Sequence, residues 1–297
     1  MTNLSKKFRE ELTKVSLISI LHPLRTEEAR DGTKKFLFEL EDKKRIESVL
    51  IPDKDRLTLC ISTQAGCAFG CKFCLTGKMG LKRNLTTSET LNQILAVRET
   101  LNGKRSMTNI VLMGMGEPLA NYENTMKAIE LMLHPDAFKF SSRRVTLSTV
   151  GLLPEMEKMA TERIRFRLAI SLNATEEETR SQLMPINRRY PLKKILQLCR
   201  TFPLQPRSRI TFEYVMLREI NDSPRDAKRL LKMLNRIPSK VNLIPLNEAP
   251  GIPFKRPSDE TVRQFQEILI NGGLTTIVRA SKGAEISAAC GQLSGKG

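Results

Sequence analysis

The feature that most restricts the fold of this chain is a regular alternation of short apolar runs and segments of helical pattern. The apolar runs cover residues 57–62, 109–113, 144–149, 166–172, 210–217, 241–246 and 275–279. The helical patterns between them cover residues 88–101, 122–133, 154–161, 192–202, 224–237 and 259–271. Parallel strands need long crossover connections, so this alternation predicts a parallel sheet covered by helices.

About six strand-helix units predict an α/β fold, a partial (βα)6 TIM-like barrel. The first part of the chain differs. Residues 1–30 mix charged and apolar positions and predict a short helical lead-in, whereas residues 35–51 alternate and predict a β-hairpin. Ser88 and Ser258 are the expected N-caps of two helices. We therefore predict an N-terminal extension over residues 1–52 and one larger domain over residues 53–297.

The charge of the chain favours a polyanionic partner. Lys and Arg together number 49 against 32 Asp and Glu, a formal net charge of +17. Such an excess favours RNA or DNA over a small acidic substrate, and the alternative is a basic surface that only keeps the protein soluble. We find no signal peptide and no apolar run of membrane-spanning length, and six cysteines suit a reducing compartment, so we expect a cytoplasmic protein without membrane contact.

A run of three cysteines, Cys67, Cys71 and Cys74, follows the first apolar run with the spacing C-x3-C-x2-C. A structural zinc site takes four ligands, and a ferredoxin cluster takes four cysteines. The other cysteines and both histidines, His22 and His134, stand outside this spacing. Three thiolates on a cubane cluster would leave one iron free for a small molecule, which predicts a catalytic centre. Zinc is the alternative.

Polar residues follow the predicted strands at the ends where barrels of this kind carry their chemistry. We expect them on one rim, although each of them would also suit a turn or a cap. These residues are the cysteine run, the stretch Gly114-Met115-Gly116-Glu117-Pro118, Ser148, Ser171, Asn173, Asn247 and Cys290.

The cysteine run, with Phe73 directly before its last member, resembles the signature of the radical S-adenosylmethionine (SAM) proteins. Further stretches resemble one group among them, the RNA adenosine methyltransferases of the RlmN/Cfr type, over nearly the whole chain. The matching stretches are Gly114–Leu119, Arg143–Thr149, Met184–Asn187, Glu213–Leu217, Asn242–Pro245 and Ala288–Leu293.

The resemblance implies cofactors and their ligands. Cys67, Cys71 and Cys74 would hold a [4Fe-4S] cluster, and an external one-electron reductant such as flavodoxin or ferredoxin would feed it. Two SAM molecules would be used per turnover. The positions that match SAM contacts in the family are Gly116, Glu117, Ser148, Ser171, Leu172, Asn173 and Asn247.

The resemblance also gives roles to two more thiols. Cys290 would accept a methyl group from one SAM, and a second SAM, cleaved reductively, would yield a 5'-deoxyadenosyl radical that takes a hydrogen from that methyl. The carbon radical would add to adenine, and Cys60 would resolve the RNA–protein adduct by forming a disulfide with Cys290. The target is an electron-poor ring carbon, which ordinary transfer from SAM would not methylate, and thiols suit this route. Glu47 matches a proposed proton acceptor, but in the hairpin it would equally suit a solvated face. Cys199 is expected in the core.

The implied function is methylation of carbon 2 of an adenosine in large-subunit ribosomal RNA, and the sequence leaves open whether tRNA is a substrate instead or as well. We expect a monomer. Methylation at carbon 8 by the same mechanism is one alternative, and a non-enzymatic RNA-binding protein with a structural metal site is another. Candidate RNA contacts are Lys78, Lys82, Arg83, Arg143, Arg144, Arg188, Arg189, Lys255 and Arg256.

The chain departs from the family pattern at three places. Asn173 stands where His is common, and Lys282-Gly283-Ala284-Glu285-Ile286 replaces Arg-Gly-x-Asp-Ile. The chain begins close to the catalytic domain, so we expect the small helical accessory domain of the family to be missing or shortened, which bears on RNA affinity.

Overall fold

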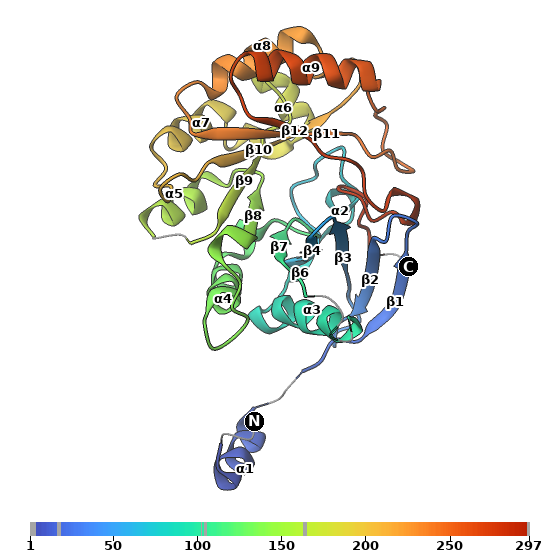
Figure 1. Cartoon of the computed structure of the whole chain (residues 1–297), viewed down its shortest axis with the longest axis vertical. Coiled ribbons are helices and arrows are strands. Elements are labelled where there is room, and N and C mark those ends of the chain that lie inside the picture. The colour runs from blue at the N-terminus through green and yellow to red at the C-terminus, as the bar shows by residue number, and fades with distance from the viewer. Residues whose placement is uncertain (1–3, 17–18, 102, 104–105, 163–164, 296–297) are drawn as a thin grey trace.

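The fold is built around one ten-stranded sheet in the order β1-β2-β3-β4-β7-β8-β9-β10-β11-β12. The structure is a computed structural model, and it describes residues 4–16, 19–101, 103, 106–162 and 165–295 (Figure 1). The strands are β1 (Pro23–Glu28), β2 (Lys34–Glu39), β3 (Arg45–Asp53), β4 (Arg56–Cys60), β7 (Asn109–Leu112), β8 (Val145–Thr149), β9 (Arg167–Ser171), β10 (Ile210–Met216), β11 (Ser239–Pro245) and β12 (Thr276–Val278).

From β4 to β12 every neighbouring pair of strands is parallel, as the alternation predicts. Helices connect these strands and lie on the outside of the curved sheet (Figure 1). The partial barrel is therefore confirmed. The helices that match the predicted segments are α3 (Thr87–Thr100), α4 (Tyr122–Leu133), α5 (Leu153–Thr161), α7 (Leu192–Thr201), α8 (Pro224–Leu234) and α9 (Asp259–Asn271).

The N-terminal hairpin of β2 and β3 is confirmed, and β3 continues into the barrel by pairing antiparallel with β4. The helical lead-in is correct only for α1 (Lys6–Val15), which buries no side chain. Residues 23–28 form the edge strand β1 instead. This strand is mostly exposed and so lacks an apolar alternation to reveal it. Residues 1–3 and 17–18 of the predicted lead-in lie outside the described residues. The division predicted between residues 52 and 53 stays a prediction.

Helix α3 begins two residues earlier than the predicted cap Ser88 suggests. Thr86 is its N-cap, because the Thr86 side chain accepts a hydrogen bond from Glu89 N while the Glu89 carboxylate accepts one from Thr86 N. This reciprocal capping box satisfies two backbone donors at once, and the predicted cap at Ser88 is wrong. The cap at Ser258 is confirmed, since its hydroxyl accepts from Thr261 N at the start of α9.

The sequence pattern did not predict a short hairpin of β5 (Gln64–Cys67) and β6 (Gly80–Asn84), nor helices α2 (Leu75–Lys78) and α6 (Glu177–Leu183). These elements follow the carboxyl ends of β4 and β9. Each is too short to show a helical or strand period. The hairpin with α2 carries the cysteine run.

Side-chain alternation along β10 separates the packed core from the polar interior of the barrel. Phe212 and Tyr214 point outward, where the Tyr214 ring lies 5.5 Å from that of Phe265 on α9, and the Tyr214 hydroxyl donates to Asn221 O at 2.8 Å. Glu213 points the other way, into the barrel. In the described part of the chain, no helix is long and apolar enough to cross a membrane.

Candidate active site

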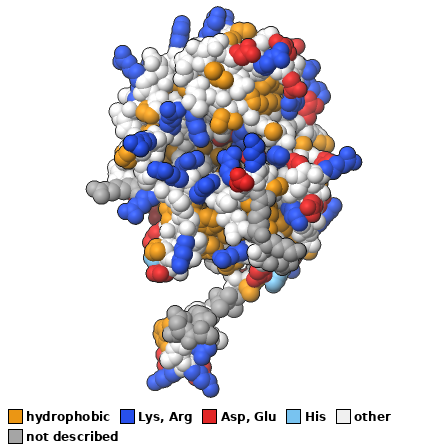
Figure 2. Space-filling model, viewed as in Figure 1, with side chains coloured by type: hydrophobic (Ala, Val, Ile, Leu, Met, Phe, Trp, Pro, Cys, Tyr) orange, Lys and Arg blue, Asp and Glu red, His pale blue; other side chains and the backbone are white. Residues whose placement is uncertain are grey.

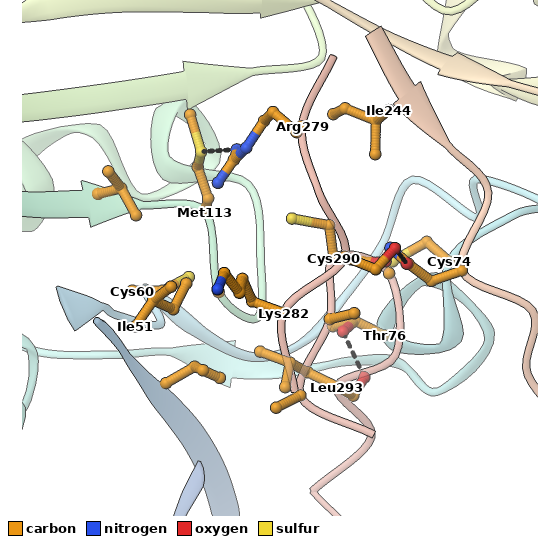
Figure 3. Close-up of a pocket in the computed structure, with 18 of the residues that line it drawn as sticks. Ile51, Cys60, Cys74, Thr76, Met113, Ile244, Arg279, Lys282, Cys290 and Leu293 are labelled. Carbon is orange, nitrogen blue, oxygen red and sulfur yellow. Dashed lines mark hydrogen bonds between the residues drawn. The ribbon is translucent and has the colours of Figure 1, made fainter. Parts of the chain in front are cut away.

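Two adjoining cavities lie at the carboxyl ends of the parallel strands. The inner cavity has a volume of about 160 Å³, and its walls include Gly116, Glu117, Ser148, Ser171, Asn173 and Asn247. The thiol cavity has a volume of about 110 Å³, and both Cys60 and Cys290 line it (Figure 3). Cys74, Met113, Arg279 and Cys290 contribute to both cavities, so the two spaces share a wall.

The cysteine run forms a compact loop beneath these cavities. Cys67 ends β5, Cys71 is buried, and Cys74 stands at the start of α2, where its backbone N donates to Cys71 O at 3.2 Å. The loop is anchored from outside, since Lys72 N donates to Leu183 O and Leu75 N donates to Gly291 O. The second bond joins the loop directly to the Cys290 segment.

The donor set of this loop fits an iron-sulfur cluster. Burial raises the pKa of the Cys71 thiol, and the nearby Cys74 and Cys67 thiols raise it further, so the three cysteines lie close enough to act on one another. Iron bound to the three thiolates would offset the unfavourable electrostatic interaction between them. Cys74 in addition faces the inner cavity, where a small molecule can reach it. Among the described residues, no three His, Cys, Asp or Glu side chains surround a point that would hold a single metal ion.

The turn after β7 needs its glycines. A Cβ at Gly114 would lie 2.7 Å from the Ile61 carbonyl, and Gly116 has a φ of +104°, which side-chain-bearing residues rarely adopt. The turn brings Glu117 to the cavity wall, where its carboxylate accepts from Leu119 N at 3.1 Å and from Val150 N at 2.8 Å. Burial raises the Glu117 pKa to about 7 despite these bonds. A buried carboxylate of this kind gains from a cationic ligand.

The end of β9 presents Ser171 and Asn173 to the inner cavity, but not Leu172. Leu172 is buried, and its carbonyl accepts from the Arg180 guanidinium at 3.0 Å. The Asn173 amide is held by the fold, because its Oδ1 accepts from Val215 N at 2.8 Å and its φ is +59°. Asn tolerates this left-handed conformation better than most residues, which accounts for the residue type.

The segment that carries Cys290 crosses the open end of the barrel and is tied at both sides. The Cys290 carbonyl accepts from Asn247 Nδ2 at 3.2 Å, and Thr76 Oγ1 donates to Leu293 O at 2.6 Å. Cys290 is exposed, and Figure 3 shows its side chain pointing into the thiol cavity, toward Met113 and Arg279. This placement is open to an incoming substrate.

Cys60 lies across the thiol cavity at the end of β4. Its thiol is buried, and burial, with a smaller contribution from Cys290, raises its pKa to about 12, while Arg279 lowers it. All six cysteines belong to the described residues and all are free. The structure thus brings together two thiols that are 230 positions apart in the sequence, since 290 − 60 = 230.

Arg279 is the residue of this site that the sequence analysis missed. Its guanidinium faces both thiols and approaches Glu213 at 3.9 Å and the Met113 sulfur at 3.8 Å (Figure 3). Electrostatic interaction with Cys290, and to a smaller extent with Glu213 and Cys60, raises the pKa of Arg279, so the guanidinium stays protonated. Its position at the carboxyl end of the last predicted strand is the signal that would have indicated it.

Glu47 does not line either cavity. Its Oε2 accepts from Ser294 N at 2.8 Å and from Gly295 N at 3.0 Å, and its Oε1 lies 3.5 Å from Lys35 Nζ. It is buried, not on the solvated face that was the alternative. In this structure the Glu47 carboxylate fastens the chain just after Cys290 to β3, and its role as a proton acceptor stays a prediction. Cys199 is buried on α7, as expected.

The candidate RNA contacts fall into two groups. Most lie at the carboxyl-end rim around the cavities, but Arg143 and Arg144 precede β8 and so lie at the opposite end of the barrel. Arg83 is engaged within the protein, because its guanidinium pairs with Asp42 at 2.6 Å and with Glu89 at 2.7 Å. It holds the β5–β6 hairpin in place and is poorly suited to bind RNA.

Comparisons with known proteins agree with this geometry. Residues 61–231 match the model of the radical SAM superfamily. The dual-specificity RNA methyltransferase RlmN of Geotalea uraniireducens is 54% identical over all of this chain and 85% of its own length, and that of Syntrophotalea carbinolica is 52% identical over all of this chain and 79% of its own length. A crystal structure of a radical SAM methyltransferase from Sphaerobacter thermophilus superposes with a TM-score of 0.93 at 44% identity, covering 99% of this chain and 87% of that one.

These matches extend over both cavities and the cysteine run. The superfamily brings with it a [4Fe-4S] cluster and SAM, and the relatives' activity makes RNA the substrate. The chain is therefore an enzyme that methylates RNA and depends on SAM, and it belongs to the RlmN family of dual-specificity RNA methyltransferases within the radical SAM superfamily.

Proposed function

We propose that this enzyme methylates carbon 2 of adenosine in large-subunit ribosomal RNA and in tRNA, by way of a methylated Cys290 and a covalent RNA–protein adduct that Cys60 resolves. The observation that carries the proposal is the placement of Cys60 and Cys290 on the walls of one cavity that adjoins the inner cavity. A methyltransferase that passed the methyl group directly from SAM to RNA would not need two thiols there.

In this proposal Cys67, Cys71 and Cys74 hold the cluster and the inner cavity holds SAM. The Glu117 carboxylate, buried and without a cationic partner among its described contacts, would receive the SAM ammonium group. Ser148, Ser171, Asn173 and Asn247 offer hydrogen-bonding groups around the rest of the molecule. When bound, the cluster supplies the electron that cleaves SAM reductively. Leu172 contributes backbone positioning, since its side chain is buried away from the cavity.

The chemistry of the thiols follows from their surroundings. Cys290 is the exposed thiol, so it can lose its proton to solvent and attack the methyl carbon of the first SAM; the bond from that carbon to the SAM sulfur breaks, and S-adenosylhomocysteine leaves. Cys60 stays protonated at rest, because burial raises its pKa to about 12. It becomes a nucleophile only when its proton is removed, and Arg279 stabilises the thiolate that then forms.

The resolving step joins the two thiols. The Cys60 thiolate attacks Cys290 Sγ, the new bond is a disulfide, and the bond between Cys290 Sγ and the carbon attached to RNA breaks. The electron pair of that bond goes to the carbon, which takes up a proton and becomes the methyl group of the product. An external reductant must then reduce the disulfide before another turnover.

We further propose that each turnover uses two SAM molecules, that a one-electron donor such as flavodoxin or ferredoxin reduces the cluster, and that the enzyme works as a cytoplasmic monomer. Methylation at carbon 8 is the alternative product. The cavity residues described above do not by themselves favour one ring carbon over the other.

The test is anaerobic reconstitution with iron and sulfide, followed by incubation with SAM, a reductant and large-subunit ribosomal RNA, and mass spectrometry of the nucleosides. We expect 2-methyladenosine, and 8-methyladenosine in its place would refute the choice of carbon. Cys60→Ala should trap the RNA–protein adduct, whereas Cys290→Ala should abolish methylation and retain the cluster. Free methylated RNA at the wild-type yield from Cys60→Ala would contradict the resolving role.

A further inference from the structure

A second group of cations lies at the opposite end of the barrel from the cavities. Arg56, Arg167 and Lys240 stand at or near the first positions of β4, β9 and β11, and other arginines precede β8 and β10. Because β4 and β7 to β11 are successive parallel strands of one sheet, their first residues lie at the same end of the barrel. We call this group the lower basic site, and its members are Arg56, Arg143, Arg144, Arg167, Arg207, Arg209 and Lys240.

The lower basic site is a hollow and not only a charged surface. A cavity of about 340 Å³ opens among its residues. Hydroxyl and amide groups and the apolar residues Phe166, Leu168, Leu204 and Pro206 complete its walls, and no Asp or Glu belongs to the described residues that line it. The lining includes Arg143, Arg167, Arg207, Arg209, Lys240, Ser142, Gln205 and Ser208. Figure 2 shows Lys and Arg side chains spread over much of the face that it presents, with acidic ones among them.

The positive charge of this site is poorly compensated by the protein. Arg56 pairs with Asp53 at 3.0 Å, and Arg209 donates to Thr275 Oγ1 at 2.8 Å. Arg143, Arg167 and Arg207 form no ion pair within the part of the chain that the structure describes. Like charges held together in this way repel one another, and a bound anion would relieve the repulsion.

The pKa shifts of two members of the lower basic site are consistent with repulsion among its cations. Burial lowers the pKa of Arg167, and Arg144, Arg143 and Arg56 lower it further. Burial likewise lowers the pKa of Lys240, with further lowering by Arg167, Arg56 and Arg209, against which Glu213 acts from inside the barrel.

The number of cations indicates a chain of phosphates and not one phosphate group. Seven Lys and Arg residues belong to the site, and they act on one another around the end of the curved sheet, since Arg56 on β4 lowers the pKa of Lys240 on β11. One phosphate group would neutralise only part of this charge. An RNA backbone, with its regularly repeated charge, would neutralise more of it.

We propose that the lower basic site binds the phosphate backbone of the substrate RNA, as a contact separate from the one at the cavities. The inference rests on RNA being the substrate. The strands β4 and β7 to β11, of four to seven residues each, separate the two ends of the barrel by about 13–23 Å. A folded RNA that presents its adenosine to the cavities would therefore reach the lower site with a second segment that passes along the side of the barrel.

The test is equilibrium binding of large-subunit ribosomal RNA between about 50 and 200 mM KCl, without SAM or reductant, to the triple variant Arg143→Gln/Arg167→Gln/Lys240→Gln. Removing three phosphate-binding cations should reduce the slope of log K against log [KCl] by about 2 and weaken binding at least tenfold. The matched control is Lys194→Gln/Arg225→Gln/Lys228→Gln, which removes the same charge from exposed positions of α7 and α8. It should bind RNA within about threefold of the wild type.

Two results would overturn the proposal. The first is an unchanged slope in the triple variant, or an equal change in the control. The second is unchanged RNA binding together with slower reduction of the cluster by flavodoxin, which would assign the site to an acidic electron donor. The variant Arg143→Lys/Arg167→Lys keeps the charge and should keep the slope. It thus distinguishes a loss of positive charge from a loss of folding as the cause of weaker binding. Nucleoside analysis of the wild-type reaction tests the carbon-2 assignment independently, because the binding assay involves no methylation.

Discussion

The resting state of Cys60 leads to a quantitative prediction about its reactivity. Burial raises the Cys60 pKa from 9.0 to about 12. At pH 8 a thiol of pKa 9 is about 10% thiolate, and one of pKa 12 is about 0.01%, a difference of about 1000-fold. The more basic thiolate is intrinsically more nucleophilic, by about 20-fold for three pKa units at a Brønsted coefficient near 0.45. Cys60 should therefore react about 40-fold more slowly than a free thiol, before its limited access slows it further.

The assay is alkylation by iodoacetamide of the cluster-loaded enzyme, in which the cluster ligands are protected, with mass spectrometry of the cysteine peptides at several times. The Cys60 rate should rise about tenfold per pH unit up to at least pH 10.5, while that of a free thiol levels off above pH 9. Arg279→Gln should slow Cys60 further, because the guanidinium stabilises the thiolate. Cys199 provides the internal control: it is also buried with a pKa of about 12, but the charge that acts on it is Arg200, so Arg279→Gln should leave its rate unchanged.

A Cys60 rate that reaches a plateau below pH 10 would refute the reasoning, since the thiol would then be titrating near its ordinary pKa. Circular dichroism at each pH shows whether the fold persists through the series. If Arg279→Gln accelerates Cys60, the guanidinium hinders access more than it stabilises the thiolate.

Three further predictions concern residues around the cavities. If the Glu117 carboxylate pairs with the SAM ammonium, its pKa of about 7 makes SAM binding about tenfold weaker at pH 6 than at pH 8; calorimetry should show this dependence in the wild type and its loss in Glu117→Gln. The substitution Arg180→Met removes a buried guanidinium, which donates to Leu172 O, Ser171 O, Val150 O and Asn187 Oδ1. It should lower the free energy of unfolding, measured by urea titration, by about 3 kcal/mol, and a loss below about 1 kcal/mol would contradict this prediction. Glu47→Ala should lower the free energy of unfolding by about 2 kcal/mol and increase proteolysis of the segment around Cys290, whereas Glu47→Gln, which keeps an acceptor oxygen, should lose less stability. Equal proteolysis of Glu47→Ala and the wild type would contradict the proposed anchoring of this segment by Glu47.

The sequence predicts the barrel well because its strands are buried on both faces and its helices are amphipathic, so both leave a strong periodic signal. It predicts β1 poorly because that strand is an exposed edge, where residue choice is weakly constrained. The hairpin β5–β6 is equally hard to see, because Gln64–Cys67 has only four residues and is held by contacts with distant segments.

For the site, spacing alone indicates the cysteine run and the rim residues, because both depend on local sequence and on the direction of strands. The pairing of Cys60 with Cys290 depends on closure of the sheet and was expected only from the resemblance. Arg279 and the burial of Glu47 depend on side-chain packing between segments that lie far apart in the sequence, which no local pattern records.

The contact of Glu47 with the chain after Cys290 would leave little trace in the sequences of related proteins. Glu47 accepts from the backbone amides of residues 294 and 295, and every amino acid except proline carries that amide. A change at position 294 therefore need not be matched by a change at position 47. Methods that infer contacts from correlated substitutions would miss this one, and a proline at position 294 is the substitution that would reveal it.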